Sequence, residues 1–137
     1  YIEKINANPQ LLPEEDSIVN KLDHGLTGMA MKIAVERHVG RIETCYTPMG
    51  LAYVQTGKDL TNLTRVIGTG GPVINSKNIK VIMEETKFEE GDKFLLKPRA
   101  PDFFVDEGYI LPAMGLLAEI YPEAAIRLMK KKLKRVL

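Results

Sequence analysis

The sequence predicts an α/β domain in which helices pack on a three-stranded sheet, and three observations support this. A helical period runs over residues 13–38, strand-like segments follow at 41–46, 51–56 and 62–67, and a glycine-rich turn then leads into further helices. A helix, a hairpin, a strand, a glycine turn and a helix in that order are typical of a layered α/β domain. The 137 residues suffice for one domain with a buried core.

The composition is that of a soluble globular protein, with 45% hydrophobic and 27% charged residues. A net charge of +1 gives no reason to expect nucleic acid or an anionic membrane as a partner. Cys45 is the only cysteine, so no internal disulfide forms and the cytoplasm is the simplest compartment. No apolar run reaches membrane-spanning length. Because the chain begins with Tyr1, we expect a fragment of a longer protein, with residues 1–12 as a linker or disordered start and 13–137 as one subdomain.

The long helix is expected from Pro13 to His38. Proline suits the first helical turn, the acidic residues at 14–16 complement the helix dipole, and Gly40 ends the helix. An apolar stripe recurs at spacings of three and four and is expected to face the core: Ile18, Leu22, Leu26, Met29 and Ile33. Gly25 and Gly28 each cost roughly 1 kcal/mol within a helix, which close packing of another backbone would offset.

Two strands at 41–46 and 51–56 are rich in β-branched and aromatic residues, and the turn chemistry of residues 48–50 joins them in a hairpin. A third strand at 62–67 ends at the glycine turn. After the turn, residues 72–86 are expected to be helical with a break near 75–78, and 88–99 to form a polar surface loop. A short buried strand at 102–106 and two helices, one from Glu107 onward and one from Pro122, complete the chain.

The glycine turn is the candidate site, formed by Gly68, Thr69, Gly70, Gly71 and Pro72. Glycines between a strand and a helix let a ligand approach the backbone amides, which suits a phosphate or ribose. The turn is not a P-loop, because no Lys-Ser or Lys-Thr closes it, and it lacks the full dinucleotide-binding spacing. From the spacing alone, nucleotide binding and a purely structural strand–helix connection both stay open.

Other polar residues favour structural roles. His24 and His38 are fourteen residues apart, too far for one metal site, and Cys45 has no partner at ligand spacing. Lys58 and Asp59 are interpreted as a local turn pair, with a ligand contact on this loop as the alternative. The acidic residues between 84 and 92 are read as a solvated surface, and the basic run at 130–135 as a helix end, with a partner site there as the alternative. No nucleophile with its base, and no pair of carboxylates, points to a catalytic centre.

Several motifs, taken in order, resemble one family. They are Ala34-Val-Glu-Arg-His38, Gly40, Tyr46-Thr-Pro-Met-Gly50, Val54-Gln-Thr-Gly-Lys-Asp-Leu60, Val66-Ile-Gly-Thr-Gly-Gly-Pro72, Arg99-Ala-Pro101, Asp106, Tyr109-Ile-Leu111, Ala113-Met-Gly-Leu-Leu-Ala118 and Tyr121-Pro-Glu123. Together they closely resemble the C-terminal part of the MutL/GlmL proteins associated with glutamate mutase, which are unrelated to the mismatch-repair protein of similar name. The resemblance covers about residues 8 to 133.

That resemblance implies a ribonuclease H-like C-terminal subdomain of an actin/Hsp70-like ATPase. It implies a reactivating factor that releases damaged cobalamin from an adenosylcobalamin-dependent mutase, either glutamate mutase or an aminomutase, in an ATP-dependent cycle. Gly68, Thr69, Gly70, Gly71 and Pro72 match the family motif that touches the adenosine and α-phosphate. ATP or ADP with magnesium is the implied cofactor of the full-length protein.

The sequence departs from the superfamily pattern at its two other phosphate motifs. Each needs an Asp at a strand end followed by Gly and small hydroxyl residues, and neither Asp23-His-Gly25 nor Asp106-Glu-Gly108 fits. We therefore expect the N-terminal half of the family protein to hold the metal and the terminal phosphates, and this chain alone to hydrolyse no ATP. The alternative function is a protein-interaction module that docks on the mutase through the C-terminal helices, with a structural glycine turn.

Overall fold

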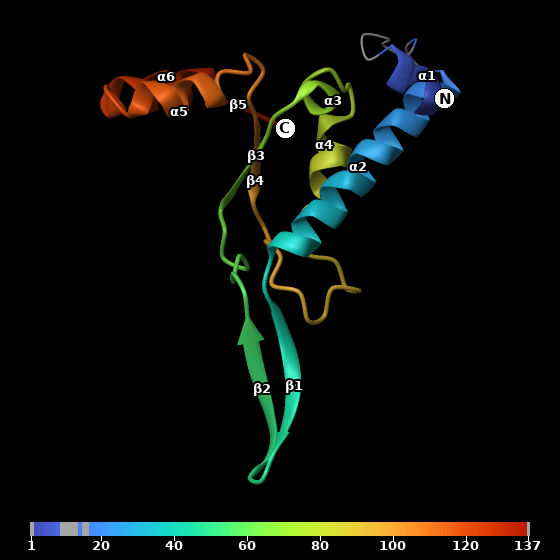
Figure 1. Cartoon of the computed structure of the whole chain (residues 1–137), viewed down its shortest axis with the longest axis vertical. Helices are drawn as coiled ribbons and strands as arrows, with labels where there is room; N and C mark the ends of the chain where they lie inside the picture. The colour runs from blue at the N-terminus through green and yellow to red at the C-terminus, as the bar shows by residue number, and fades with distance from the viewer. Residues whose placement is uncertain (1, 9–13, 15–16, 137) are drawn as a thin grey trace.

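The computed structural model describes residues 2–8, 14 and 17–136 and shows a mixed α/β chain (Figure 1). The elements follow in the order α1 (Ile2–Ala7), α2 (Ile18–His38), β1 (Arg41–Thr47), β2 (Gly50–Thr56), β3 (Arg65–Gly68), α3 (Gly71–Ile74), α4 (Ile79–Glu84), β4 (Asp102–Val105), α5 (Leu111–Ala118), α6 (Pro122–Lys132) and β5 (Lys134–Arg135). None of the helices in the described ranges is long and apolar enough to cross a membrane.

Helix α2 confirms the predicted long helix over its described part. Ser17 caps it, because the Ser17 Oγ accepts a hydrogen bond from the Asn20 N–H at 3.0 Å. The helix ends at His38, two residues before Gly40, as predicted. The expected first position, Pro13, lies outside the described residues. Within the expected linker or disordered start, the residues Ile2–Ala7 form α1.

The prediction that the apolar stripe of α2 faces the core is wrong, because the stripe lies on the solvent side of the helix. The opposite face packs on α3 and α4, and there Gly28 is buried. A Cβ on Gly28 would lie 3.3 Å from the Glu85 Cγ, so glycine permits the close approach of the two helices. Met31 on this face packs against the core. The helix therefore contacts the rest of the chain through the face that contains Gly28 and Met31, rather than through its leucine-rich face.

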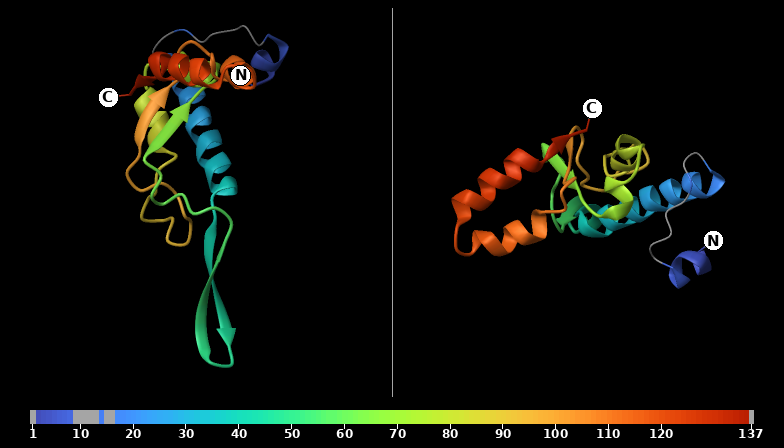
Figure 2. Two further views of the ribbon diagram at one scale, coloured as in Figure 1. Left: turned by 90° about the vertical axis from the view of Figure 1, so that its left-hand side faces the viewer. Right: turned by 90° about the horizontal axis from the view of Figure 1, so that it is seen from above.

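The hairpin of β1 and β2 is confirmed, with Arg41 opposite Thr56 and Thr47 opposite Gly50. It forms a two-stranded sheet of its own and does not join the predicted third strand. In Figures 1 and 2 it extends away from the other elements. The base of the hairpin is attached to the loop at 88–99, because the Ile42 N–H donates to the Phe94 carbonyl at 2.8 Å.

The second sheet has the strand order β3–β4–β5 and positions the glycine turn. Strands β3 and β4 run parallel, with Gly68 opposite Val105, and β5 pairs antiparallel with β4. The sequence analysis did not predict β5, a strand of two residues. The buried core beside this sheet consists of Val73, Met83, Phe103 and Val105.

The segment predicted as a polar surface loop, 88–99, is irregular but contains buried residues, so the surface assignment is wrong for its second half. Leu96 and Lys97 are buried, and the Leu96 N–H donates to the Gly40 carbonyl at 2.9 Å. The Lys97 Nζ lies 2.8 Å from the Asp92 Oδ2. Burial acts to raise the pKa of Asp92, but the contacts with Lys97 and with the Glu89 N–H outweigh it, and the pKa is lowered.

The predicted helix at 72–86 is broken between α3 and α4, as expected near residues 75–78. The predicted C-terminal helices are present as α5 and α6. They pack against each other and extend to one side of the sheet (Figure 2). No residue of α5 is buried, so this helix pair presents apolar side chains to solvent.

Candidate functional site

The candidate site lies where the parallel strands β3 and β4 end. Gly68 is the last residue of β3, and its carbonyl accepts a hydrogen bond from the Asp106 N–H at 3.0 Å. The two chain segments that leave the sheet, at Thr69 and at Asp106, therefore start side by side. In open α/β sheets, ligands bind outside the carboxyl ends of the parallel strands. The predicted glycine turn lies at this position, directly after the carboxyl end of β3.

The three glycines of the turn have different physical roles. A Cβ on Gly68 would lie 2.6 Å from the Met83 Sδ and 3.0 Å from the Val73 Cγ1, so Gly68 is a packing residue. Gly70 has φ of +100°, which L side chains rarely adopt, and a Cβ there would meet nothing within 4 Å. Gly71 begins α3 and is exposed. Only Gly70 therefore combines a glycine-only backbone conformation with open space in front of it.

The backbone around Gly70 leaves donors available. The Gly70 carbonyl accepts from the Val73 N–H at 3.1 Å and from the Ile74 N–H at 2.9 Å, which closes the first turn of α3. Within the described part of the chain, the N–H groups of Thr69 and Gly70 have no backbone acceptor. Thr69 and Pro72 are exposed. The turn thus offers two amide donors and a hydroxyl to an anionic or hydroxylated ligand.

Asp106, at the neighbouring strand end, is fully buried and is used in the fold. Its Oδ1 accepts from the Ile110 N–H at 3.1 Å, and its Oδ2 accepts from the Leu111 N–H at 2.9 Å. Both oxygens thus cap the start of α5. Each carboxylate oxygen of Asp106 thus accepts one backbone N–H of this helix start. Nowhere in the described ranges do three or more His, Cys, Asp or Glu residues come together as a metal site.

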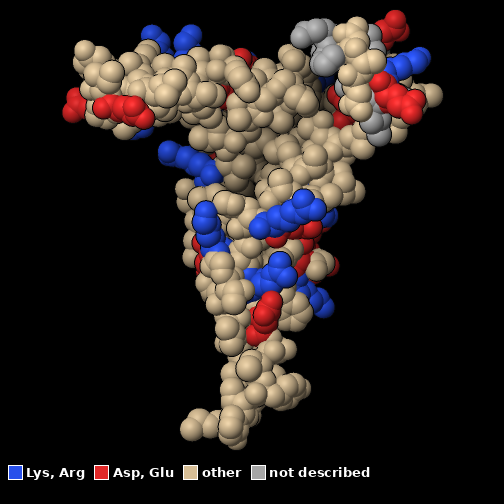
Figure 3. All heavy atoms as spheres, in the orientation of Figure 1, with Lys and Arg blue, Asp and Glu red and all other residues tan. Residues whose placement is uncertain are grey.

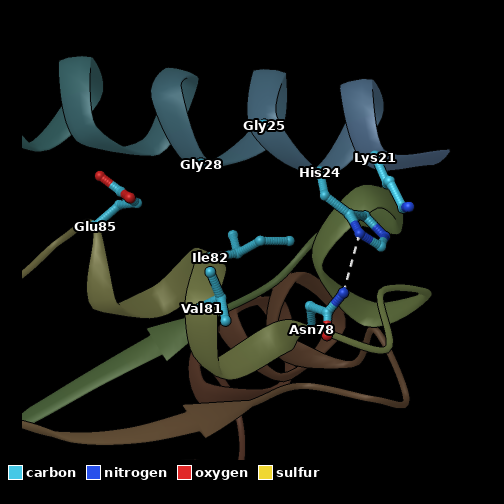
Figure 4. Close-up of a pocket in the computed structure, with 8 residues that line it drawn as sticks. All are labelled: Lys21, His24, Gly25, Gly28, Asn78, Val81, Ile82 and Glu85. Atoms are coloured by element: carbon cyan, nitrogen blue, oxygen red, sulfur yellow. Dashed lines mark hydrogen bonds between the residues drawn. The ribbon is translucent and has the colours of Figure 1, made fainter. Parts of the chain in front are cut away.

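A groove of about 400 Å³ lies between α2 and α4, and no residue of the glycine turn lines it (Figure 4). Its lining residues are Lys21, His24, Gly25, Gly28, Asn78, Val81, Ile82 and Glu85. The His24 Nδ1 lies 3.4 Å from the Asn78 Nδ2, as the dashed line shows. The sequence analysis assigned His24 a structural role and missed this groove. The glycines of α2 were the available signal, because Gly25 leaves open space where a side chain would stand.

The polar residues assigned structural roles have local partners. Asp59 accepts from the Thr61 hydroxyl at 2.6 Å and from the Thr61 N–H at 2.9 Å, and these bonds lower the pKa of Asp59. The Lys58 Nζ lies 3.4 Å from the His38 Nε2. The bonds of Asp59 within its own turn agree with the sequence interpretation, whereas Lys58 contacts the end of α2 rather than Asp59.

The acidic and basic segments form ion pairs within the chain. The interpretation of the acidic residues as a solvated surface is wrong for Asp92, which is buried beside Lys97. The Lys32 Nζ lies 2.9 Å from the Glu89 Oε2. Their hydrogen bond raises the pKa of Lys32 and lowers that of Glu89. At the end of the chain, Lys134 pairs with Glu107 at 2.8 Å, and this contact ties β5 to the segment that follows β4.

The described residues therefore define a mixed α/β protein with a glycine turn at the carboxyl edge of a parallel strand pair, and without a metal cluster of its own. The family profile described as MutL protein matches residues 1–133. Protein MutL of Clostridium tetanomorphum is 47% identical over 127 residues, which are 93% of this chain and 27% of that relative. The chain belongs to the MutL protein family. It spans about a quarter of the length of this relative. No solved structure matches the chain significantly.

Proposed function

We propose that this chain is the nucleotide-contacting C-terminal part of an ATP-dependent reactivating factor for an adenosylcobalamin-dependent mutase, either glutamate mutase or an aminomutase. Membership of the MutL family supports the proposal. One structural observation carries it: the open, left-handed Gly70 stands at the carboxyl edge of the parallel pair β3–β4. Such an edge is where α/β proteins bind nucleotides.

In this proposal Gly68, Thr69, Gly70, Gly71 and Pro72 contact the adenosine and the α-phosphate of ATP or ADP. The amides of Thr69 and Gly70 donate to the ligand, and the missing side chain of Gly70 gives it access. Magnesium and the terminal phosphates are bound by the N-terminal half of the family protein. Asp106 supports the site by capping α5 beside the turn. The isolated chain therefore binds nucleotide weakly and does not hydrolyse it.

Two substitutions in a full-length MutL protein carrying this segment test the proposal. Gly70→Val fills the open space, and Thr69→Glu brings a negative charge to the approach of the phosphate without straining the backbone. Both variants are expected to weaken ATP binding at least tenfold, as measured by calorimetry. Gly50→Val is the matched control, because Gly50 also has a positive φ, of +115°, and open space but lies in the turn of the hairpin. Unchanged ATP affinity in folded Gly70→Val and Thr69→Glu proteins would disprove the role of the turn. Clear ATP hydrolysis by the isolated chain would contradict the proposal that magnesium and the terminal phosphates are bound by the N-terminal half of the family protein.

A second candidate function is docking on the mutase through α5 and α6, with a structural glycine turn. The helix pair extends from the sheet, and both Leu116 and Ile120 are more than 70% exposed. Its basic end also keeps Lys130 to Lys132 exposed. Capture of mutase components by the chain, abolished by Leu116→Glu with Ile120→Glu and insensitive to nucleotide, would favour this function. If the chain captures no mutase component, docking through this helix pair is rejected.

A further inference from the structure

Helix α2 has an apolar seam on the side that faces away from the chain. We define the seam by its five residues, Ile18, Leu22, Leu26, Met29 and Ile33, which are between 38% and 78% exposed. Their spacings of four, four, three and four residues keep them on one face of the helix. At 1.5 Å per residue the seam is roughly 22 Å long. The opposite face, with the buried Gly28, packs on α3 and α4.

A stripe of long aliphatic side chains on the unpacked face of a helix is typical of a helix that a further element covers. A helix at the surface of a finished domain has one apolar face and one charged face. In α2, by contrast, the longer aliphatic side chains stand on the unpacked side, and the contact with α4 uses a glycine. A contiguous exposed surface of this kind indicates a contact with another polypeptide segment.

We propose that the seam packs against the region of the MutL polypeptide that lies outside the segment matched by this chain. Nearly three quarters of the C. tetanomorphum relative lies outside that segment, which is enough polypeptide to cover a helix face. The proposal rests on family membership and on the length of the relative, and it is independent of nucleotide binding.

The distribution of the other exposed apolar residues favours this occupant over a second copy of the chain. Residues 44–56 of the hairpin contain no charged residue, and the end of the hairpin accordingly shows neither blue nor red in Figure 3. Tyr46 there is 86% exposed, and Leu116 on α5 is 71% exposed. A two-fold contact between copies covers one self-complementary patch. A large polypeptide can cover the seam, the hairpin and α5 together.

Thiol protection tests the proposal with two separately produced polypeptides, this chain and the part of C. tetanomorphum Protein MutL outside the matched segment. Cys45 is exposed, so Cys45→Ser is the background. Leu26→Cys places a thiol in the seam, and Lys93→Cys places the control thiol in an exposed loop. Both thiols are expected to react rapidly with a maleimide in the chain alone. Addition of the second polypeptide is expected to slow the reaction of Leu26→Cys at least tenfold and to leave Lys93→Cys unchanged.

Association of the same two polypeptides is then measured by co-elution with light scattering. Leu22→Glu combined with Met29→Glu is expected to abolish co-elution, whereas Phe94→Glu, at an equally exposed loop residue, is expected to retain it. Unchanged circular dichroism establishes that the variants fold. Absence of co-elution for the unsubstituted chain, co-elution that survives the double substitution, or a dimer of the chain that the double substitution dissociates would each overturn the proposal. No nucleotide or mutase is present, so a failure of the proposed function leaves this result intact.

Discussion

The buried ion pair of Lys97 and Asp92 gives the sharpest prediction about stability. The Lys97 side chain is completely buried, and its Nζ atom lies 2.8 Å from the Asp92 Oδ2 at an angle outside hydrogen-bond geometry. The Asp92 Oδ2 also accepts from the Glu89 N–H at 2.9 Å. Asp92→Asn keeps the size of the side chain and an acceptor for Glu89, but it removes the negative charge beside the buried ammonium group.

The magnitude follows from the separation and the burial of the pair. At 2.8 Å and an effective dielectric constant of about 20, the attraction is roughly 6 kcal/mol before desolvation is subtracted. Desolvation of both ions offsets most of it, so the pair itself contributes little net stability. Removing one partner is different, because Lys97 keeps its desolvation cost, and Asp92→Asn should therefore cost about 3–5 kcal/mol. Lys97→Met added to Asp92→Asn removes the unpaired charge and should recover most of that loss.

Urea unfolding followed by circular dichroism measures these free energies. With a slope of about 2 kcal/mol per molar urea, the midpoint of Asp92→Asn should fall by roughly 2 M. Glu90→Gln, at an exposed acidic residue of the same loop, should stay within about 0.5 kcal/mol of the unsubstituted chain. A loss below about 1 kcal/mol for Asp92→Asn, or no recovery in the double variant, would refute the reasoning.

The pH dependence provides a separate check on the same pair. The pKa of Asp92 is lowered in the folded chain, so its stabilising contribution is complete above the unfolded-state pKa, about 3.9. The contribution is lost as the pH falls through the lower folded-state pKa. The difference in stability between the unsubstituted chain and Asp92→Asn should accordingly shrink over that acid range. A difference that stays constant down to the lowest pH at which the chain folds would contradict the assignment.

Three further predictions concern the site and its surroundings. Gly68→Ala should lower the free energy of unfolding by about 1–3 kcal/mol, because the new Cβ would lie 2.6 Å from the Met83 sulfur. The control Gly91→Ala should change it by less than about 1 kcal/mol. Equal effects of the two substitutions in urea unfolding would contradict the packing role of Gly68. Asp106→Ala should cost about 2 kcal/mol and increase amide hydrogen exchange at the start of α5, since two N–H groups lose their acceptor; unchanged exchange there would reject the cap. Lys32→Met should raise the pKa of Glu89 toward its ordinary value in an NMR titration of the carboxyl carbon, and a pKa that does not move would show that the ion pair is absent in solution.

The local elements could be predicted from the sequence because their signals are local. Turn chemistry at residues 48–50 predicted the hairpin, and the glycines after Ile67 predicted the turn at the end of β3. Each depends on backbone preferences of a few neighbouring residues. The nucleotide contacts assigned to the turn stay a prediction, since they depend on a ligand and on a second protein region.

The wrong predictions arose where packing partners decide the outcome. The apolar period of α2 was recognised, but periodicity does not say whether the apolar stripe contacts this chain. The opposite face does so, and Gly28 permits its close approach to α4. The loop at 88–99 contains polar residues that suggest a surface, yet Lys97 is buried because Asp92 neutralises it. Strand β5 is two residues long and forms only by pairing with β4, so no local pattern marks it.

At the candidate site, the bonds that hold the backbone in place are separate from the groups that would contact a ligand. Asp106 fixes the start of α5, and the bond from its N–H to the Gly68 carbonyl fixes the end of β3. Gly70 then adopts its left-handed conformation between two anchored ends, with its carbonyl bound to the first turn of α3. The conformation of the turn is thus maintained by bonds within the chain and does not require a ligand. Nucleotide affinity and folding should therefore be separable at this site, and Thr69→Glu, which leaves all of these bonds in place, is the variant that separates them.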